Sequence, residues 1–403
     1  MMPLTKLRIP MAENTHYDLV ILGGGCAGLS LASKLSEYGE KAPKVLIIEQ
    51  RTKYTNDRTW CFWDIDHPEN QSLVSQSWST FELANQQRVH HFDCSQHPYL
   101  MLESQHFYEA AIKEISANPK IQLMLGQEAL SAPIKSPSGW LVKTAHAEIC
   151  SKFVVDTRPP KNLSHDDSLL WQSFVGYEIQ TQADCFSPEK MVLMDFDPTF
   201  KNGLAFIYIL PTTGKKALIE YTVFSEHIID HQELTTRLKE SIKQKIGSSP
   251  YELLRTEHGT LPMGNKLADQ NKDPSYLYAG LFAGAARPSS GYAFQRIQGW
   301  ANKCAQSILT HNMLFAFPKE KRLQSFMDGL FLEVIKKNPA MAASLFEDLF
   351  TRCDLKTVVK FMSDKASLYE YFQIIRSLPP LPFIKALPRF LIQKMCNRIG
   401  FVS

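Results

Sequence analysis

Hydrophobic residues at the start of the chain form a strand–turn–helix–strand pattern. Residues 17–23, YDLVILG, make a near-continuous apolar run, which is typical of a buried parallel strand. Glycine-rich sequence follows, then a helical period over residues 27–38 and a second apolar run at residues 45–49. This order predicts the opening unit of a doubly wound α/β sheet.

The middle of the chain has a different pattern, in which short strand-like runs alternate with turn signals. Helical patterns at residues 104–117 and 232–246 interrupt these runs. We therefore expect an antiparallel sheet inserted beside the parallel one. The predicted strands are residues 121–125, 140–144, 153–156, 174–179, 191–196, 204–210 and 217–224.

The last third of the chain returns to the first pattern and then becomes helical. A strand at residues 276–279 leads into a Gly/Ala-rich loop and a long helix at about residues 292–314. The region beyond residue 318 is mostly helical, and its last part alternates apolar and basic residues. Such a tail is consistent with an amphipathic helix at a membrane surface and equally with a helix that caps the body.

Composition narrows the class of protein. The chain has 403 residues, of which 44% are hydrophobic and 21% charged, as in a globular fold. Its net charge of +3 is too balanced to predict a nucleic-acid partner. Aromatic residues make up 11%, enough to line a large apolar pocket. No apolar run is long enough to span a bilayer, and residues 1–16 lack the apolar core of a secretory signal.

The cysteines and histidines do not form metal-site spacings. The eight cysteines are dispersed without a CxxC pair, so zinc ribbons and thioredoxin-type motifs are not indicated. Dispersed thiols in a chain of this size fit a reducing compartment. His227 and His231 are four residues apart, but no glutamate follows His227 as in a zinc hydrolase. We therefore expect no metal.

The most specific motif is a dinucleotide fingerprint. Gly23, Gly25 and Gly28 form GxGxxG between the first strand and the first helix. In this motif the glycines allow a tight turn, the approach of a pyrophosphate and close packing of helix on strand. Glu49 ends the second strand, where a carboxylate meets the ribose hydroxyls of the cofactor. An acid at this place disfavours a 2′-phosphate, so we do not expect NADP in this site.

The length of the intervening sequence favours FAD over NAD. An N-terminal fingerprint followed by a long mixed region and a late glycine-rich segment, here residues 277–294, is typical of proteins that bind extended FAD. Many such proteins carry a Gly-Asp pair in the late segment, but this chain has Gly284-Ala285. The contact with the ribityl chain is therefore expected to differ.

At this segment the sequence resembles the bacterial lycopene β-cyclases. Residues 279–297, AGLFAGAARPSSGYAFQRI, are similar to the flavin-proximal motif of that family, which implies cofactor contacts at Gly280, Gly284, Pro288 and Gly291. Further similar segments follow the family's order and cover most of residues 17–300. They are DRTWCFW at 57–63, FVVDTR at 153–158, WQSFVG at 171–176, FIYILP at 206–211 and LIEYT at 218–222.

The resemblance implies a fold in three parts. It is an α/β fold with a Rossmann-type FAD-binding domain, an inserted antiparallel-sheet substrate domain and a helical C-terminal region. We expect an N-terminal extension at residues 1–16 and an FAD-binding domain from residues 17–110 and 270–315. Residues 111–269 then form a mixed region that includes the substrate sheet, and residues 316–403 form the helical region.

The resemblance also implies a reaction without net redox. Protonation of the end group of lycopene gives a tertiary cation, ring closure follows, and loss of a proton leaves a β-ionone ring, as in γ-carotene and β-carotene. This chemistry needs a positioned acid in a dry pocket. Residue types alone favour Glu220 as a solvent-facing acid or a partner of Lys215 or Lys216, but the family match indicates the catalytic carboxyl.

The sequence offers two candidates for a second carboxylate that would act with Glu220. The family often has one directly after its glutamate, where this chain has Tyr221. If a second carboxylate takes part in the reaction, we expect Asp195 or Asp197 to supply it. For the substrate tunnel, the candidate aromatic residues are Trp60, Phe62, Trp63 and Tyr292, which otherwise would be core residues.

The remaining expectations concern partners and alternatives. The family implies reduced FAD with NADPH or NADH as external reductant, and a carotene substrate drawn from a membrane. We expect a cytoplasmic, peripheral membrane enzyme. Arg287 is equally consistent with a phosphate or flavin contact and with an ion pair to the inserted sheet. The alternatives are a redox FAD enzyme of the same fold, such as a monooxygenase or isoprenoid reductase, and an FAD-bound carotenoid binder without catalysis.

Overall fold

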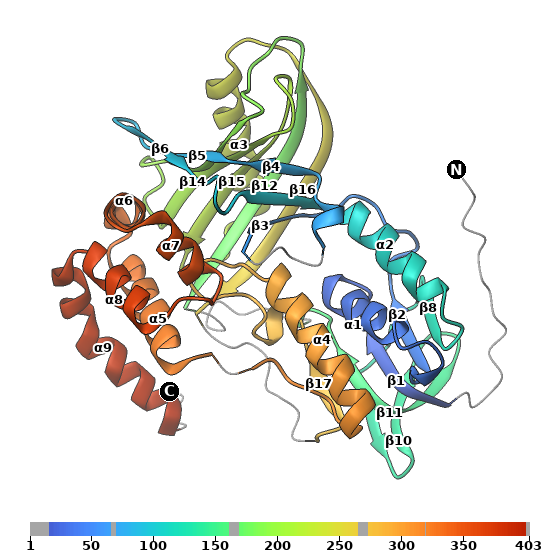
Figure 1. The fold of residues 1–403 in the computed structure, drawn as a ribbon. Helices are drawn as coiled ribbons and strands as arrows, with labels where there is room; N and C mark the ends of the chain where they lie inside the picture. Colours follow the sequence, from blue (N-terminus) through green and yellow to red (C-terminus); the bar gives the residue numbers. More distant parts are fainter. Residues whose placement is uncertain (1–15, 66–69, 161–168, 265–272, 319, 400–403) are drawn as a thin grey trace.

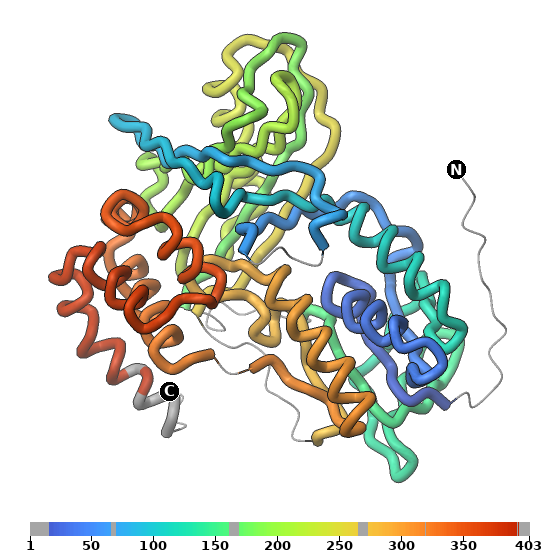
Figure 2. Tube along the Cα trace, viewed as in Figure 1, coloured from blue at the N-terminus to red at the C-terminus, as the bar shows by residue number. Residues whose placement is uncertain are grey.

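A computed structural model describes residues 16–65, 70–160, 169–264, 273–318 and 320–399 (Figures 1 and 2). The expected N-terminal extension lies outside these residues, except for His16, which begins strand β1. The described elements form an α/β layer, a large second sheet and a group of C-terminal helices, each in its own part of Figure 1.

The first sheet contains the expected parallel strands. Its order is β8-β2-β1-β11-β10-β9, and β17 also pairs with β11. Strands β8, β2, β1, β11 and β17 run parallel, which explains the unbroken apolar runs of β1 and β2. Helices α1, α2 and α4 bury one face of this sheet in an apolar core. The bounds are β1 (His16–Leu22), α1 (Cys26–Ser36), β2 (Val45–Glu49), α2 (Ser104–Ser116), β8 (Ile121–Leu125), β9 (Ile134–Ser136), β10 (Gly139–Lys143), β11 (Glu148–Asp156), β17 (Tyr276–Tyr278) and α4 (Phe294–His311).

The second sheet is the expected antiparallel one, and it stands above the first in Figure 1. Its order is β16-β12-β15-β14-β13-β5-β6, with one parallel pair between β13 and β5. Helix α3 packs on one face, and the other face turns toward the rest of the molecule. The bounds are β5 (Thr80–Ala84), β6 (Val89–Asp93), β12 (Leu170–Thr181), β13 (Lys190–Phe196), β14 (Leu204–Pro211), β15 (Lys216–Ser225), α3 (His231–Ile246) and β16 (Tyr251–Met263).

A small sheet and a helical region complete the fold. The small sheet, in the order β3-β7-β4, lies between the two large ones in Figure 1. In the described ranges, each helix is either too short or too polar to cross a bilayer. The bounds are β3 (Thr59–Trp63), β4 (Gln76–Trp78), β7 (Tyr99–Glu103), α5 (Arg322–Lys337), α6 (Pro339–Arg352), α7 (Leu355–Met362), α8 (Leu368–Ser377) and α9 (Pro380–Ile399), with short 3-10 turns η1 (Gly39–Lys41), η2 (Gln71–Leu73) and η4 (Leu281–Ala283).

Strand pairing crosses the expected boundaries between the two sheets. The strands predicted at residues 121–125, 140–144 and 153–156 belong to the first sheet, as β8, β10 and β11. Strands β5 and β6, from the range assigned to the FAD-binding domain, extend the second sheet instead. Each of the two large sheets is therefore assembled from segments that are far apart in sequence. Both sheets contribute residues to the region that lies between them.

Candidate functional site

A large cavity lies where the two sheets, the small sheet and the helices meet. Its volume is about 1530 Å³, which exceeds the ~300–1,000 Å³ of an ordinary single-ligand pocket. Its wall runs from the glycine-rich loop after β1 to Phe346 and Phe350 on α6 and Met362 on α7. One continuous space therefore connects the dinucleotide fingerprint with the inner face of the antiparallel sheet.

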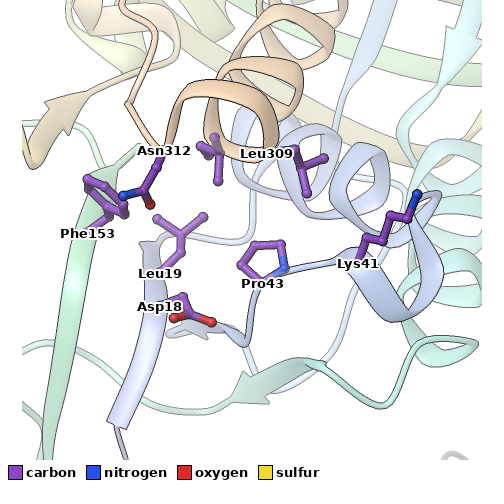
Figure 3. Close-up of a pocket in the computed structure, with 8 residues that line it drawn as sticks. Asp18, Leu19, Lys41, Pro43, Phe153, Leu309 and Asn312 are labelled. Atoms are coloured by element: carbon purple, nitrogen blue, oxygen red, sulfur yellow. The ribbon is translucent and has the colours of Figure 1, made fainter.

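A second pocket is smaller and lies elsewhere. It has a volume of about 250 Å³ and lies beside the beginning of β1, at the end of the strand away from the fingerprint (Figure 3). Asp18, Leu19, Phe153 and Asn312 are among its lining residues, and the Asp18 carboxylate already accepts a hydrogen bond from the Lys44 backbone N–H. This pocket has no pair of acids and none of the predicted site residues. Within the described part of the chain, His, Cys, Asp and Glu form no cluster suited to a metal ion.

The fingerprint glycines have the distinct backbone roles that the motif predicts. Gly23 has φ +95°, a conformation that favours glycine. A Cβ at Gly28 would overlap the Gly23 carbonyl oxygen, so helix and strand pack too closely for any side chain. Gly25 differs, because a Cβ there would meet no protein atom closer than Arg51 Nη2, at 3.8 Å. The loop therefore leaves space open at Gly25, at the N-terminus of α1.

The N-terminus of α1 and Glu49 lie next to each other on the cavity wall. Helix α1 has no side-chain cap at Gly25, so its first N–H groups are available to an anion. Glu49 is 4% exposed and lines the cavity at the end of β2. Its carboxylate accepts hydrogen bonds from the Gly24 N–H at 2.6 Å and from the Arg51 N–H at 2.8 Å. These bonds fix its orientation at the strand end.

The late glycine-rich segment places two of its four candidate cofactor-contact residues on the cavity wall. Gly280 (φ +87°) and Gly291 (φ +72°) line the cavity, and a Cβ at Gly291 would come within 2.6 Å of Gln172 Oε1. Gly284 (φ +96°) is exposed, and neither it nor Pro288 lines the cavity. Positive φ at Gly284 supports a conformational role for this residue.

The four aromatic residues predicted for the tunnel separate into two groups. Trp60 and Tyr292 line the cavity. Phe62 is 4% exposed and stacks on Phe294 at a centroid distance of 5.4 Å, and Trp63 is 3% exposed and packs edge-on against Tyr99. Phe62 and Trp63 are therefore core residues. Phe62 lies on the same face of β3 as Trp60, since both stack on Phe294, but Phe62 is covered and only Trp60 reaches the cavity.

A row of four residues crosses the inner face of the antiparallel sheet. Glu257 on β16 is opposite Gly176 on β12, Gly176 is opposite Glu220 on β15, and Glu220 is opposite Tyr208 on β14. A Cβ at Gly176 would lie 2.8 Å from Glu220 Cγ and 3.2 Å from Glu257 Cγ. The absence of a side chain at Gly176 therefore allows the two glutamates to meet across it, where they share a hydrogen bond.

Glu220 lines the cavity in an environment that favours its neutral form. Burial raises the pKa of Glu220 well above the usual range for a glutamate. The neighbouring Glu257 carboxylate adds to this rise, and Arg255 opposes it. Glu257 itself is 3% exposed and does not line the cavity. Glu220 is thus a carboxyl whose neutral form is favoured by its surroundings and which lies on the cavity wall.

The two aspartates proposed as a second acid lie elsewhere. Asp195 forms an ion pair with Lys245 of α3, and Asp197 accepts a hydrogen bond of 2.6 Å from the Tyr221 hydroxyl. Although burial raises it, hydrogen bonds from Thr199 and Tyr221 lower the pKa of Asp197 below its ordinary value. Tyr221 follows Glu220 in the strand and faces the α3 side. The structure does not bring Asp195 or Asp197 together with Glu220.

A chain of phenols continues from the acid toward the late segment. The Tyr208 hydroxyl donates to the Tyr99 hydroxyl at 3.1 Å, and Tyr99 and Tyr292 hydroxyls are also 3.1 Å apart. All three line the cavity, and burial raises the pKa of Tyr99 and of Tyr208 well above that of an exposed tyrosine. The phenols therefore stay protonated and bond one another inside the cavity.

Arg287, in the late glycine-rich segment, packs against the helical region. It is fully buried, it pairs with Asp328 of α5 at 3.1 Å and with Asp364 at 3.5 Å, and its guanidinium lies 4.3 Å from the Phe361 ring centroid. The sequence left a phosphate or flavin contact and an ion pair to the inserted sheet equally open for Arg287, and the structure instead pairs Arg287 with the C-terminal helical region. Arg287 anchors the late glycine-rich segment to α5.

Comparison with known proteins identifies the family. A family model described as Lycopene cyclase protein matches residues 18–387. A lycopene beta-cyclase from Pantoea ananas is 26% identical over 395 residues, which are 92% of this chain and 97% of that protein. A solved geranylgeranyl bacteriochlorophyll reductase-like protein from Thermoplasma acidophilum has a TM-score of 0.65 at 15% identity, covering 94% of this chain and 100% of that one. Aklavinone-11 hydroxylase, solved with FAD and aklavinone, has a TM-score of 0.58 at 13% identity, covering 82% and 71%.

These comparisons carry different weight. At 15% and 13% identity, the two solved structures show a shared fold and nothing finer. The family model, by contrast, covers most of the chain, including both sheets, the glutamate row and the first turns of α9. The chain therefore belongs to the lycopene cyclase family of enzymes.

Proposed function

We propose that this enzyme is a lycopene β-cyclase that closes the ends of lycopene into β-ionone rings with no net redox change. The observation that carries the proposal is Glu220, a carboxyl with a raised pKa on the wall of a cavity that also reaches the dinucleotide fingerprint. An alkene is a weak base, so its protonation needs a neutral acid held in a place that excludes water. The raised pKa of Glu220 and its position among apolar lining residues support it as this acid.

The cavity wall also suits the cation that protonation creates. Phe174, Phe206 and Phe224 project from the same face of the antiparallel sheet as Glu220 and line the cavity. Aromatic faces attract cations, by about 2 kcal/mol or more where water is excluded. After Glu220 gives its proton to the terminal alkene carbon, its own carboxylate remains nearby as a negative charge. Ring closure and loss of a proton from the ring then leave the atom count of the substrate unchanged.

FAD is the cofactor that the site fits best. Gly23, Gly25 and the N-terminus of α1 would hold its pyrophosphate, Glu49 its ribose, and Gly280 and Gly291 the flavin end. This assignment rests on the open space at Gly25 and the uncapped helix. When bound in its reduced, anionic form, with NADPH or NADH as the electron source, FAD supplies negative charge or acid–base groups beside the substrate.

A redox flavoenzyme is the second candidate function. It is favoured by the fold alone, because one structural neighbour is described as reductase-like and another as a hydroxylase. The carboxyl on the cavity wall argues for acid chemistry, since reduction or hydroxylation of a substrate does not need a neutral glutamate there. A carotenoid binder without catalysis is the third candidate.

One experiment separates the three functions. The FAD-loaded protein is incubated anaerobically with NADPH and liposomes that contain lycopene, and products and nucleotide are quantified. We expect monocyclic and bicyclic carotenes, γ-carotene and β-carotene, with far less NADPH oxidised than rings formed. Stoichiometric oxidation of NADPH would instead support a redox enzyme, and retained, unchanged lycopene would support a binder.

The C-terminal helices provide a surface for the membrane that holds such a substrate. Helix α9 buries Phe383, Ala386 and Phe390 against α5 and its neighbours, so it does cap the body. Its other side, with the adjoining α8, exposes large apolar side chains next to the basic Lys385 and Arg389. These residues are Leu368, Tyr369, Phe372, Ile375, Leu381, Ile384, Leu391 and Ile392. Apolar and basic groups together are typical of a peripheral surface for anionic lipid.

Membrane binding can be tested at two positions of α9. Leu381 and Ile384 are 67% and 61% exposed, and burying each in lipid should contribute about 1 kcal/mol. We expect the double variant Leu381→Ser, Ile384→Ser to lower the partition coefficient on anionic liposomes by about 30-fold in flotation assays. The matched control is Leu253→Ser, Leu254→Ser on β16, whose residues are 44% and 42% exposed. Unchanged binding of the α9 variant would contradict this surface.

A further inference from the structure

Glu257, which lies across Gly176 from Glu220, has no role in the proposed function. Glu257 is almost fully buried and is not among the residues that line the cavity. Burial of an acid is costly unless its charge is compensated. Hydrogen-bond donors surround the Glu257 carboxyl and compensate its burial, and Glu257 also interacts with Glu220.

Glu257 is held by donors from two elements. The Thr59 hydroxyl of β3 donates to Glu257 Oε2 at 2.9 Å, and Arg255 Nη1 pairs with the same oxygen. Arg255 also donates from Nη2 to Thr59 Oγ1 at 2.9 Å and from Nε to Glu178 Oε2 at 3.0 Å. Both donors bond the same oxygen of Glu257, and Arg255 is itself held by Thr59 and Glu178, so these contacts hold the Glu257 carboxyl in place.

The charges around the two glutamates do not balance when both are ionised. The titratable neighbours are Arg255 and Glu257 on β16, Glu178 on β12, Lys216 on β15, Cys61 on β3 and Tyr208 on β14. Lys216 pairs with Glu178 at 2.7 Å, and Arg255 bridges Glu178 and Glu257. Cys61 and Tyr208 are neutral. Among these groups, two cations thus face three carboxyls, and the cluster is neutral only if one proton stays.

We propose that Glu257 is a positioning residue for Glu220: the two carboxyl groups hold one proton between them across Gly176, and Arg255 and Thr59 hold Glu257 in place on the far side. The inference rests on the proposed function, in which Glu220 is the acid. Two carboxyls in contact cannot both ionise easily, so the second acts by keeping the first protonated. One proton leaves the pair when the alkene is protonated and one returns by the end of a turnover, so the pair has the same charge after each cycle.

Glu257→Gln tests the pair. Glutamine keeps the shape and a hydrogen-bond acceptor for Arg255 but removes the charge, so Glu220 should ionise more easily. We expect the alkaline limb of the kcat–pH profile of the FAD-loaded enzyme to move down by about one pH unit or more. KM for lycopene should stay unchanged, because Glu257 does not line the cavity. Glu257→Asp retains the charge, so the alkaline limb of this variant should lie closer to that of the unmodified enzyme than the limb of Glu257→Gln does. The control Glu252→Gln, an exposed acid on the same strand, should leave the profile unchanged.

A second variant reaches the pair from its centre. In Gly176→Ala the new Cβ would lie 2.8 Å from Glu220 Cγ and 3.2 Å from Glu257 Cγ, so the two side chains must separate. The alkaline limb should move in the same direction as in Glu257→Gln. If Glu257→Gln does not fold, Gly176→Ala still tests the proposal. A limb that stays in place in the folded variants would overturn it.

An infrared titration makes the test independent of cyclase activity. Protonated carboxyls absorb apart from carboxylates, and the band missing in Glu220→Gln identifies Glu220. We expect this band to titrate at a lower pH in Glu257→Gln than in the unmodified protein, both loaded with FAD. Equal midpoints would refute the pair even if the enzyme cyclises lycopene. A lowered midpoint in a protein that does not cyclise lycopene would retain the pair and refute the proposed function.

Discussion

Glu220→Gln should abolish cyclisation, lowering the rate by about 10²–10⁴-fold, the usual contribution of a positioned acid, while FAD absorbance stays intact. Glutamine has nearly the same shape and can still bond Glu257, but it has no proton acidic enough for an alkene. The residue lies in the antiparallel sheet and the fingerprint lies after β1, so cofactor binding should not change. The rate is measured from γ-carotene and β-carotene formed in liposomes, and FAD from the flavin absorbance of purified protein.

The control for this variant is a second glutamate near the same strand. Glu226 follows the end of β15, is half-exposed and pairs with Lys336 at 3.0 Å, so Glu226→Gln should cyclise lycopene at the normal rate. Full activity in Glu220→Gln would exclude Glu220 as the acid. A loss of activity in Asp195→Asn or Asp197→Asn would then assign the role to the α3 side of the sheet.

The raised pKa of Glu220 also predicts the direction of the pH dependence. The active form is the protonated one, so activity should be present below this pKa and fall as the pH rises through it. In an enzyme whose acid had an ordinary glutamate pKa, activity would already be lost well below neutral pH. The alkaline limb of the unmodified enzyme should therefore lie above the pH range in which an ordinary glutamate ionises, and this limb should be absent from any residual activity of Glu220→Gln.

Local sequence predicted the parts of the fold that depend on neighbouring residues. The first β–turn–α–β unit and most strands of both sheets follow from periodicity, because a buried strand or amphipathic helix needs its apolar residues at fixed spacing. The same reasoning missed β16, whose first half carries Glu252, Arg255 and Glu257. Charged residues in a strand usually indicate a solvent-facing position, which holds for Glu252, but Arg255 here pairs with both Glu257 and Glu178.

The site needed pairing information that the sequence does not contain. Glu220 and Glu257 are far apart in the chain, and only the register of β12 with both β15 and β16 places them on either side of Gly176. Asp195 and Asp197 have the right chemistry, but Asp195 lies on β13, two strands away from β15, and Asp197 directly follows β13. Both aspartates pair with side chains of α3. A signal was present in Gly176 itself, since a glycine inside a strand often marks a close approach of other groups.

The fingerprint allows an equally sharp test at Gly25. Its backbone is extended, with φ −80° and ψ −165°, which any residue can adopt, and a Cβ there meets no protein atom within 3.8 Å. Gly25→Val should therefore fold normally. If the open space is where a pyrophosphate approaches the helix, the two added methyl groups occupy it, and FAD affinity should fall by at least about 100-fold, or about 2.7 kcal/mol. The measurement is a calorimetric titration of apoprotein with FAD, with circular dichroism as the check on folding.

The choice of Gly25 decides whether this result can be interpreted. At Gly28 a side chain would overlap the Gly23 carbonyl oxygen, so a loss of FAD there would follow from a broken turn as readily as from a blocked cofactor. Gly299 is the matched control, because it is exposed on α4 with no atom within 4 Å of its Cβ direction, and Gly299→Val should bind FAD normally. Undiminished FAD binding in Gly25→Val would contradict the phosphate contact at this loop. Since cyclisation is proposed to depend on reduced FAD, the same variant should also lose activity in proportion to its lost cofactor, and added FAD at high concentration should restore it.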